Sequence, residues 1–286
     1  MKYAAALFGL IVLACVGVGC QAPIDSSTRS SGVQRVDVAS KRPEEVTQLL
    51  RLLPPVTIRA ELNFDPASHL LATERGFGAT GTATFVVTEY APKKTARMDW
   101  KFDTDLPSKR GSVHHQYIGN LIEVQFANTA DIFPPILWQE GIERAHGTAG
   151  IWVSSDVYEN IAKSGQSTLL FGMTNFEHAL GLAPKFPRTA LAMQALKDAM
   201  EKTHPGDPTL GKREEQKVEV SLTVNGKVTT VLAWRVQSWF GEMDILANET
   251  NPLILRVAPS AKLPRKDLWG LFGYRVTEIE GLNQPL

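Results

Sequence analysis

Cysteine is almost absent from this chain. Of the 286 residues only Cys15 and Cys20 carry a thiol, and both lie near the N-terminus. The segments that follow therefore have no disulfide to stabilise them and no thiol nucleophile. An excess of charge is absent too, with 30 basic and 30 acidic side chains. Since nucleic-acid binding needs a clustered basic excess, we expect no nucleic-acid partner.

Long apolar runs are absent after the first twenty residues, so no later segment approaches the roughly 20 apolar residues of a membrane-spanning helix. The run that does exist starts after Lys2 and extends from Tyr3 to Val18 with apolar residues and glycine only. It is short, has one charge before it and ends at the small residue Gly19 followed by Cys20. This pattern is typical of a secretory segment rather than of a spanning helix.

Residues Val16-Gly17-Val18-Gly19-Cys20 resemble the lipobox of bacterial lipoproteins, although Gly17 stands where that family usually has leucine. The resemblance implies that Met1–Gly19 is a signal peptide and that Cys20 becomes the lipid-modified N-terminus. An ordinary cleaved signal and an uncleaved anchor are the alternatives. An ordinary signal would leave an unpaired thiol, which a thioether-linked lipid removes. Two acyl chains suffice for stable anchoring.

The same resemblance places the protein in the bacterial cell envelope, with its body in the periplasm or at the cell surface. Gln21 after the cysteine, in place of aspartate, resembles the enterobacterial signal for sorting to the outer membrane. Removal of Met1–Gly19 would take away one base, Lys2, and leave 29 bases against 30 acids. The membrane, through the N-terminal lipid, is thus the first expected partner.

Periodicity predicts an α+β fold, mainly antiparallel β-sheet with a few short helices, and a half-barrel is one arrangement that we consider. Helices are expected at Arg42–Leu53, from Ser155 to Gly165 with an Asp156–Glu159 capping pair, and at Pro187–Thr203. The Asn225-Gly226 pair predicts a tight hairpin turn. Strands are expected at Val56–Leu62, Thr82–Thr88, Arg97–Phe102, Ser112–Tyr117, Leu121–Phe126, Thr148–Val153, Thr168–Phe171, Val218–Val224, Lys227–Val236, Glu242–Ala247, Leu253–Val257 and Tyr274–Ile279.

Composition divides the chain into four parts. Residues 1–19 form the signal peptide, and residues 20–41, rich in serine and glycine up to Gln34, form a lipidated, flexible tether. Residues 42–204 form a β-rich region with short helices. Residues 205–286 form a C-terminal hairpin region, in the same sheet or in a second domain, after a polar linker at His204–Glu215.

The C-terminal third also loosely resembles a module of uncharacterised β-rich bacterial envelope proteins. The residues that carry the likeness are Val224-Asn225-Gly226, Phe240-Gly241 and Asn251-Pro252-Leu253-Ile254-Leu255-Arg256, preceded by Asp105-Leu106-Pro107, His114-His115 and Trp152-Val153-Ser154. The family has no activity to transfer, so the likeness implies fold and compartment alone.

Catalytic motifs are missing: there is no G-x-S-x-G elbow, H-E-x-x-H pair, P-loop or G-x-G-x-x-G segment. His114, His115 and His146 come nearest to a metal or catalytic set. Neighbours on a strand point to opposite faces, however, and a metal needs three or four converging ligands. We therefore expect no metal, no cofactor and no catalytic residue. An envelope hydrolase or metalloenzyme using His114 or His115 with His146 is the alternative.

An unusually apolar loop, Ile132–Trp138, supplies the candidate binding residues Phe133 and Trp138. Such a loop either packs under the sheet or forms the rim of a hydrophobic binding surface. The sequence as a whole predicts a lipid-anchored, non-enzymatic envelope protein that binds an apolar ligand or another envelope protein.

Overall fold

The computed structural model describes residues 33–35, 37–38, 40–62, 80–108, 111–132, 135, 138, 140–145, 147–171, 210–238, 241–259 and 273–285. Within them the chain is built mainly from strands, as the periodicity predicts, with two short helices, α1 (Pro43–Leu49) and α3 (Ser155–Ser164). The strands are β1 (Val33–Arg35), β2 (Val56–Leu62), β3 (Thr80–Ala91), β4 (Thr95–Ser108), β5 (Gly111–Gln125), β6 (Asp131–Ile132), β7 (Gly141–Arg144), β8 (Gln166–Thr168), β9 (Leu170–Phe171), β10 (Leu210–Arg213), β11 (Val218–Val224), β12 (Lys227–Gln237), β13 (Gly241–Leu246), β14 (Ile254–Pro259), β15 (Tyr274–Glu280) and β16 (Asn283–Pro285).

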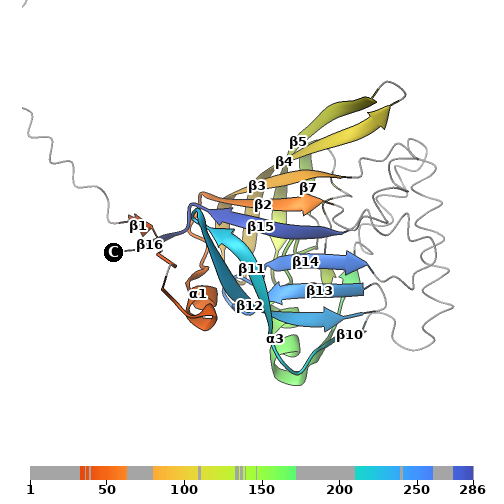
Figure 1. Cartoon of the computed structure of the whole chain (residues 1–286). Coiled ribbons are helices and arrows are strands. Elements are labelled where there is room, and N and C mark those ends of the chain that lie inside the picture. Colours follow the sequence, from red (N-terminus) through yellow and green to blue (C-terminus); the bar gives the residue numbers. More distant parts are fainter. Residues whose placement is uncertain are drawn as a thin grey trace, which may run out of the picture.

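One large, strongly curved sheet dominates the molecule (Figure 1). Strands β11 to β15 close a five-stranded ring, because β11 pairs with both β12 and β15 while β12, β13, β14 and β15 pair in succession. The other edge of β15 pairs with β2, from which β3, β4, β5 and β7 extend as an open wing. Strand β15 therefore belongs to both halves, and residues before and after the predicted linker share one sheet.

The two faces of the open wing differ in polarity. On β2 to β4, alternate side chains such as Ile58, Phe85 and Trp100 are buried, and they form the apolar face. Their neighbours, such as Arg59 and Lys101, form the opposite, polar face. This alternation is what a period of two produces when one side of a sheet is covered.

The hairpin turn at Asn225-Gly226 forms as predicted. Both residues have positive φ angles, 49° and 80°, which a type I′ turn requires. The side-chain oxygen of Asn225 accepts hydrogen bonds from the backbone N–H groups of Gly281 (3.0 Å) and Leu282 (3.2 Å). The turn thus also fastens β11 to the end of β15 and helps to close the ring.

Two buried asparagines in the turn between β13 and β14 connect three parts of the fold. Asn248 donates to the carbonyl of Thr47 (2.8 Å), and Asn251 donates to the carbonyl of Leu50 (2.9 Å), so both satisfy carbonyls at the end of α1. The side-chain oxygen of Asn251 accepts from the indole Nε1 of Trp152 (2.9 Å). Trp152 in turn packs on Tyr90 of β3, with 5.7 Å between ring centroids.

Helix α3 begins at Ser155 and ends at Gly165 as predicted, but the residues that cap its start differ from the expected pair. Ser154 is the N-cap, and its hydroxyl accepts from the backbone N–H of Val157. The expected Asp156–Glu159 capping pair does not form. Asp156 accepts from the backbone N–H of Asn128, and Glu159 pairs with Lys163 one turn later.

Three further segments depart from the sequence expectations. Thr148–Val153 is no strand: it forms only isolated bridges, because Gly147 and Gly150 have positive φ angles and turn the chain. Within the supposed linker, Leu210–Arg213 forms β10 and pairs with β8 and β12. Val33–Arg35, within the supposed tether of residues 20–41, pairs with β16. Pro187–Thr203 and residues 1–32 lie outside the described residues, so the helix and the lipobox expected there stay predictions.

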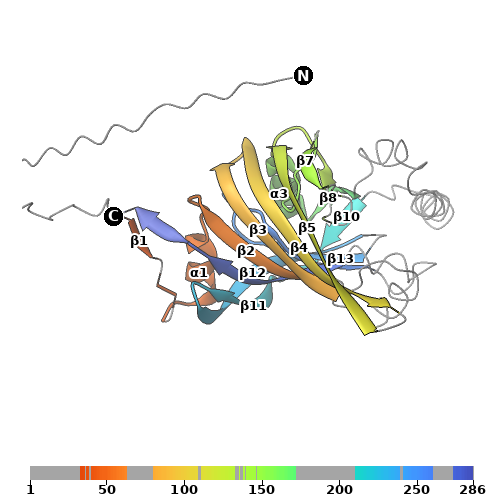
Figure 2. The ribbon, with the colours of Figure 1, turned by 90° about the horizontal axis from the view of Figure 1, so that it is seen from above.

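No described helix is long and apolar enough to cross a membrane. The first and last described strands, β1 and β16, pair with each other as a separate two-stranded sheet and lie together at one end of the molecule (Figure 2).

Candidate functional site

Trp138, predicted as a binding residue, lies inside the fold with 8% of its surface exposed. Its ring packs against three aromatic rings of the apolar face, Phe85 at 5.5 Å and Trp100 and Phe102 each at 5.9 Å between centroids. For Trp138 the structure thus corresponds to packing under the sheet, the first alternative for this loop. Phe133 lies outside the described residues, so its binding role stays a prediction.

Trp100 is held in place by a close approach of the backbone. Gly119 on β5 lies opposite it, and a Cβ atom at Gly119 would come within 2.6 Å of the Trp100 ring and of the Gly141 carbonyl. Any side chain at Gly119 would therefore displace either the indole or β7. Phe102 stacks on the same indole at 4.5 Å. The apolar face is thus closely filled around Trp100.

The indole Nε1 of Trp100 is buried and has no hydrogen-bond partner among the described residues. A buried donor without a partner costs about 1–3 kcal/mol, and native folds contain few of them. Sequence periodicity predicts that Trp100 faces inward but says nothing of its donor, which only the packing reveals.

Exposed apolar side chains lie on the outer strands of the wing, at the margin furthest from β15. On β5 and the outer strand β7, Ile118 is 58% and Ile142 is 72% exposed, and Val113 and Tyr117 are partly exposed nearby. Strand β7 pairs only with Gly119–Ile122 of β5. From Gly111 to Ile118, β5 pairs with β4 alone among the described strands, and Figure 1 shows this hairpin projecting beyond β3. We call Gly111–Ile118 the β5 edge.

The β5 edge carries no lysine, arginine, aspartate or glutamate. Soluble proteins usually protect a free strand edge with such charges, with proline or with a bulge, because an unprotected edge pairs with other strands. A neutral edge of eight residues, flanked by exposed isoleucines, therefore has the chemistry of a surface for strand addition.

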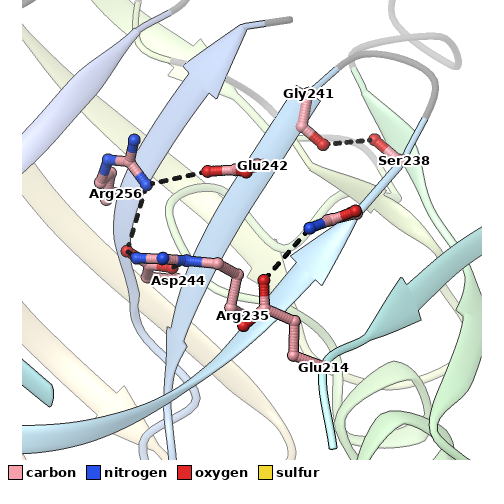
Figure 3. Close-up of polar contacts among 8 residues, drawn as sticks. Glu214, Arg235, Ser238, Gly241, Glu242, Asp244 and Arg256 are labelled. Carbon is pink, nitrogen blue, oxygen red and sulfur yellow. Dashed lines mark hydrogen bonds and ion pairs between the residues drawn. The ribbon is translucent and has the colours of Figure 1, made fainter. Parts of the chain in front are cut away.

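A charged cluster occupies the polar side of β12 to β14 (Figure 3). Asp244 is only 1% exposed and accepts a two-pronged pair from Arg235, at 2.7 Å from Nε and 3.0 Å from Nη2. Arg256 bridges Asp244 at 3.4 Å and Glu242 at 3.3 Å. Hydrogen bonding by Asp244 raises the pKa of Arg235 above its usual value. The cluster is thus a set of paired charges that joins three strands.

The histidines expected for the alternative enzyme are only partly described. His114 is exposed, and its Nε2 lies 3.4 Å from the Oδ1 of Asp103. Partial burial opposes ionisation of Asp103, but hydrogen bonds from Gln116 and Lys101 prevail and hold its pKa below the usual value. The side chain of His115, and His146 altogether, lie outside the described residues. Within the described part of the chain, no three His, Cys, Asp or Glu side chains are grouped as metal ligands.

We predict that Asp244→Asn destabilises the fold by about 2–4 kcal/mol, because it leaves two half-buried guanidinium groups without their shared carboxylate. The matched control is Glu61→Gln, which breaks the exposed pair with Arg275 and should cost about 0–1 kcal/mol. Urea unfolding of a chain that starts at Gln21 measures both values. Equal losses for the two variants would contradict a structural role for the buried cluster.

No protein-family model, curated protein or solved structure matches this chain. Relatives therefore supply no site residues, ligand or partner. The features that bear on function are the chain's own: the lipobox-like segment, the unpartnered indole of Trp100 and the exposed β5 edge.

Proposed function

We propose that this protein is a lipid-anchored, non-enzymatic component of the bacterial envelope whose β-body binds another envelope protein through the β5 edge. The lipobox-like residues before Cys20 support the anchor, and the absence of a charge excess fits a protein partner rather than nucleic acid. The outer membrane is the favoured location, because Gln21 follows Cys20.

The observation that carries the proposal is a contrast between two apolar regions, the buried face around Trp100 and the exposed isoleucines at the β5 edge. Around Trp100 and Trp138 the apolar face is filled by the protein's own rings, which favours contact through another surface. At the β5 edge, by contrast, Ile118 and Ile142 are exposed beside an uncharged strand. Exposed apolar groups on a strand edge gain free energy when a partner covers them.

The two ends of the body suit this arrangement. Strand β1, which follows the proposed anchor, lies at the opposite end of the molecule from the tip of the β4–β5 hairpin in both views (Figures 1 and 2). Val33 lies 13 positions after Cys20, so the chain between them spans at most about 45 Å. A partner can therefore reach the β5 edge without meeting the anchored end.

The anchor is tested by Cys20→Ser in a Gram-negative host that processes lipoproteins. We expect this variant to lose incorporation of labelled palmitate and to leave the membrane fraction, because the acylated thiol is gone. Cys15→Ser, which lies inside the proposed signal peptide, is the matched control and should keep both properties. Retention of the label by Cys20→Ser would overturn the proposed anchor.

The partner surface is tested with a photo-crosslinking residue placed at Ile118 in the anchored protein. We expect adducts at this position because it is exposed at the β5 edge. Val228, which is 80% exposed on β12, serves as the control for random contact and should give few adducts. No adduct at Ile118, or equal yields at both positions, would contradict binding through this edge.

A second candidate function is the binding of an apolar ligand, and the unpartnered Nε1 of Trp100 favours it. A ligand with an apolar body and one acceptor oxygen would lie against Phe102 and Trp138 and accept the missing hydrogen bond. To bind there it would have to displace some of the present packing.

Native mass spectrometry with lipid extraction, on a chain from Gln21 expressed in a bacterial periplasm, tests this second candidate. Ligand binding predicts a co-purifying apolar molecule whose occupancy falls several-fold in Trp100→Phe, which keeps the ring but removes the donor. Phe102→Leu, which keeps the donor, is the companion variant. A ligand-free mass, or unchanged occupancy in Trp100→Phe, would dismiss this candidate.

A further inference from the structure

We propose that the end of the body beside the β1–β16 ribbon is a second membrane contact, which docks on the anionic headgroups of the leaflet that holds the N-terminal lipid. We call this end, formed by residues 40–53 and 225–228, the docking end. The contact presupposes the lipid anchor of the proposed function, because the anchor at Cys20 brings the docking end to the membrane.

Exposed apolar side chains occur at the docking end as well as on the wing. Among the described residues six large apolar side chains are exposed, and four of them lie on β5 and β7. The other two, Val228 at 80% and Leu53 at 41% exposed, belong to the docking end. Val228 is the most exposed of the six. A protein partner at the β5 edge would therefore leave the docking end uncovered.

The two segments of the docking end meet beside the β1–β16 ribbon. Asn225 accepts a hydrogen bond from the backbone N–H of Gly281 at 3.0 Å, and a Cβ atom at Gly281 would lie 2.9 Å from the carbonyl oxygen of Pro55. The turn before Val228 and the segment after Leu53 thus both contact the chain just before β16. In Figure 1 the arrows of β11 and β15 point towards the end where β1 and β16 lie.

The free charges of the docking end are positive in balance. Lys41 and Arg51 are exposed and have no partner among the described residues, and Glu44 is the one acid there without such a partner. The other charged side chains form pairs, Arg42 with Glu45 and Lys227 with Asp37. One net positive charge remains, and such a charge close to an anionic membrane strengthens binding by about fivefold.

The anchor makes a weak contact sufficient. Val33 lies 13 positions after Cys20, and a serine- and glycine-rich chain of that length spans about 20 Å on average. The docking end is therefore held at a high effective concentration beside the leaflet, where a few basic and apolar side chains can keep it. Because the tip of the β4–β5 hairpin lies at the opposite end of the molecule, docking directs the β5 edge away from the membrane (Figure 2).

Photo-crosslinking on vesicles tests the contact. A chain that starts at Cys20 has one thiol, which couples to a maleimide lipid and holds the body where the native lipid would. The vesicles contain phosphatidylethanolamine and phosphatidylglycerol. With a photo-crosslinking residue at Val228 we expect lipid adducts at least about tenfold above those from the same residue at Ile142, which is 72% exposed on β7 of the wing.

A charge substitution separates docking from folding. Val228→Glu changes a side chain that is 80% exposed, so we expect it to keep the circular dichroism of the parent. With the crosslinker at Leu53, Val228→Glu should lower the lipid adducts at least about fivefold, because phosphatidylglycerol repels the new carboxylate. Ile142→Glu is the matched control and should leave these adducts unchanged. Neutral phosphatidylcholine vesicles should lower the adducts of the parent by about fivefold.

The outcomes distinguish this inference from the proposed anchor. Equal lipid adducts at positions 228 and 142 would overturn the docking end, as would adducts at position 228 that contain another protein chain in place of lipid. The maleimide lipid supplies the anchor in this measurement, so such a failure leaves the anchor to the palmitate labelling of Cys20→Ser. Retention of the palmitate label by Cys20→Ser would reject the anchor and, with it, docking in the cell.

Discussion

The hydrogen bonds of Asn248 and Asn251 are the constraint on which the rest of the fold depends. A helix as short as α1 leaves its terminal carbonyls without partners, and these are buried here against the ring of strands. The two side-chain amides satisfy them, and Asn251 also accepts from Trp152. One turn therefore joins the helix, the closed ring and the segment that covers the open wing. An unsatisfied group at any of these positions would cost the full price of desolvation.

The shared strand β15 joins two parts of the molecule, the ring and the wing, whose outer strands are paired to different extents. In the ring every strand pairs with two others, although β11 meets β15 only at Thr223 and Val224. Paired charges such as Asp244 with Arg235 fasten β13 to β12. In the wing the strands run outward to β5, whose residues 111–118 pair with β4 alone among the described strands. The apolar face beneath the wing is filled by the protein's own rings, whereas Ile118 and Ile142 at its outer end are exposed.

Local chemistry made much of this fold predictable from sequence. The Asn225-Gly226 turn and the alternating strands around it depend on neighbours in the chain, and they form as predicted. The sequence did not predict pairing between segments that are far apart in the chain. The ring is closed by β11 against β15. Leu210–Arg213 has the composition of a linker, but it forms a strand because it pairs with β12. The site was predictable in part. The apolar loop identified Trp138 as a candidate. For Ile118, periodicity predicts which face of the sheet its side chain lies on, but it cannot predict that the strand lies at the edge of the sheet.

The pairing of β1 with β16 has a mechanical consequence. If the lipid holds the N-terminus, any pull between membrane and body enters the fold at Val33–Arg35, where three residues pair with Asn283–Pro285. Strand β16 continues directly from β15, so that load passes into the strand that ring and wing share. Antiparallel strands loaded from one end can separate pair by pair. The short β1–β16 ribbon would then act as a weak link that yields first and spares the sheet.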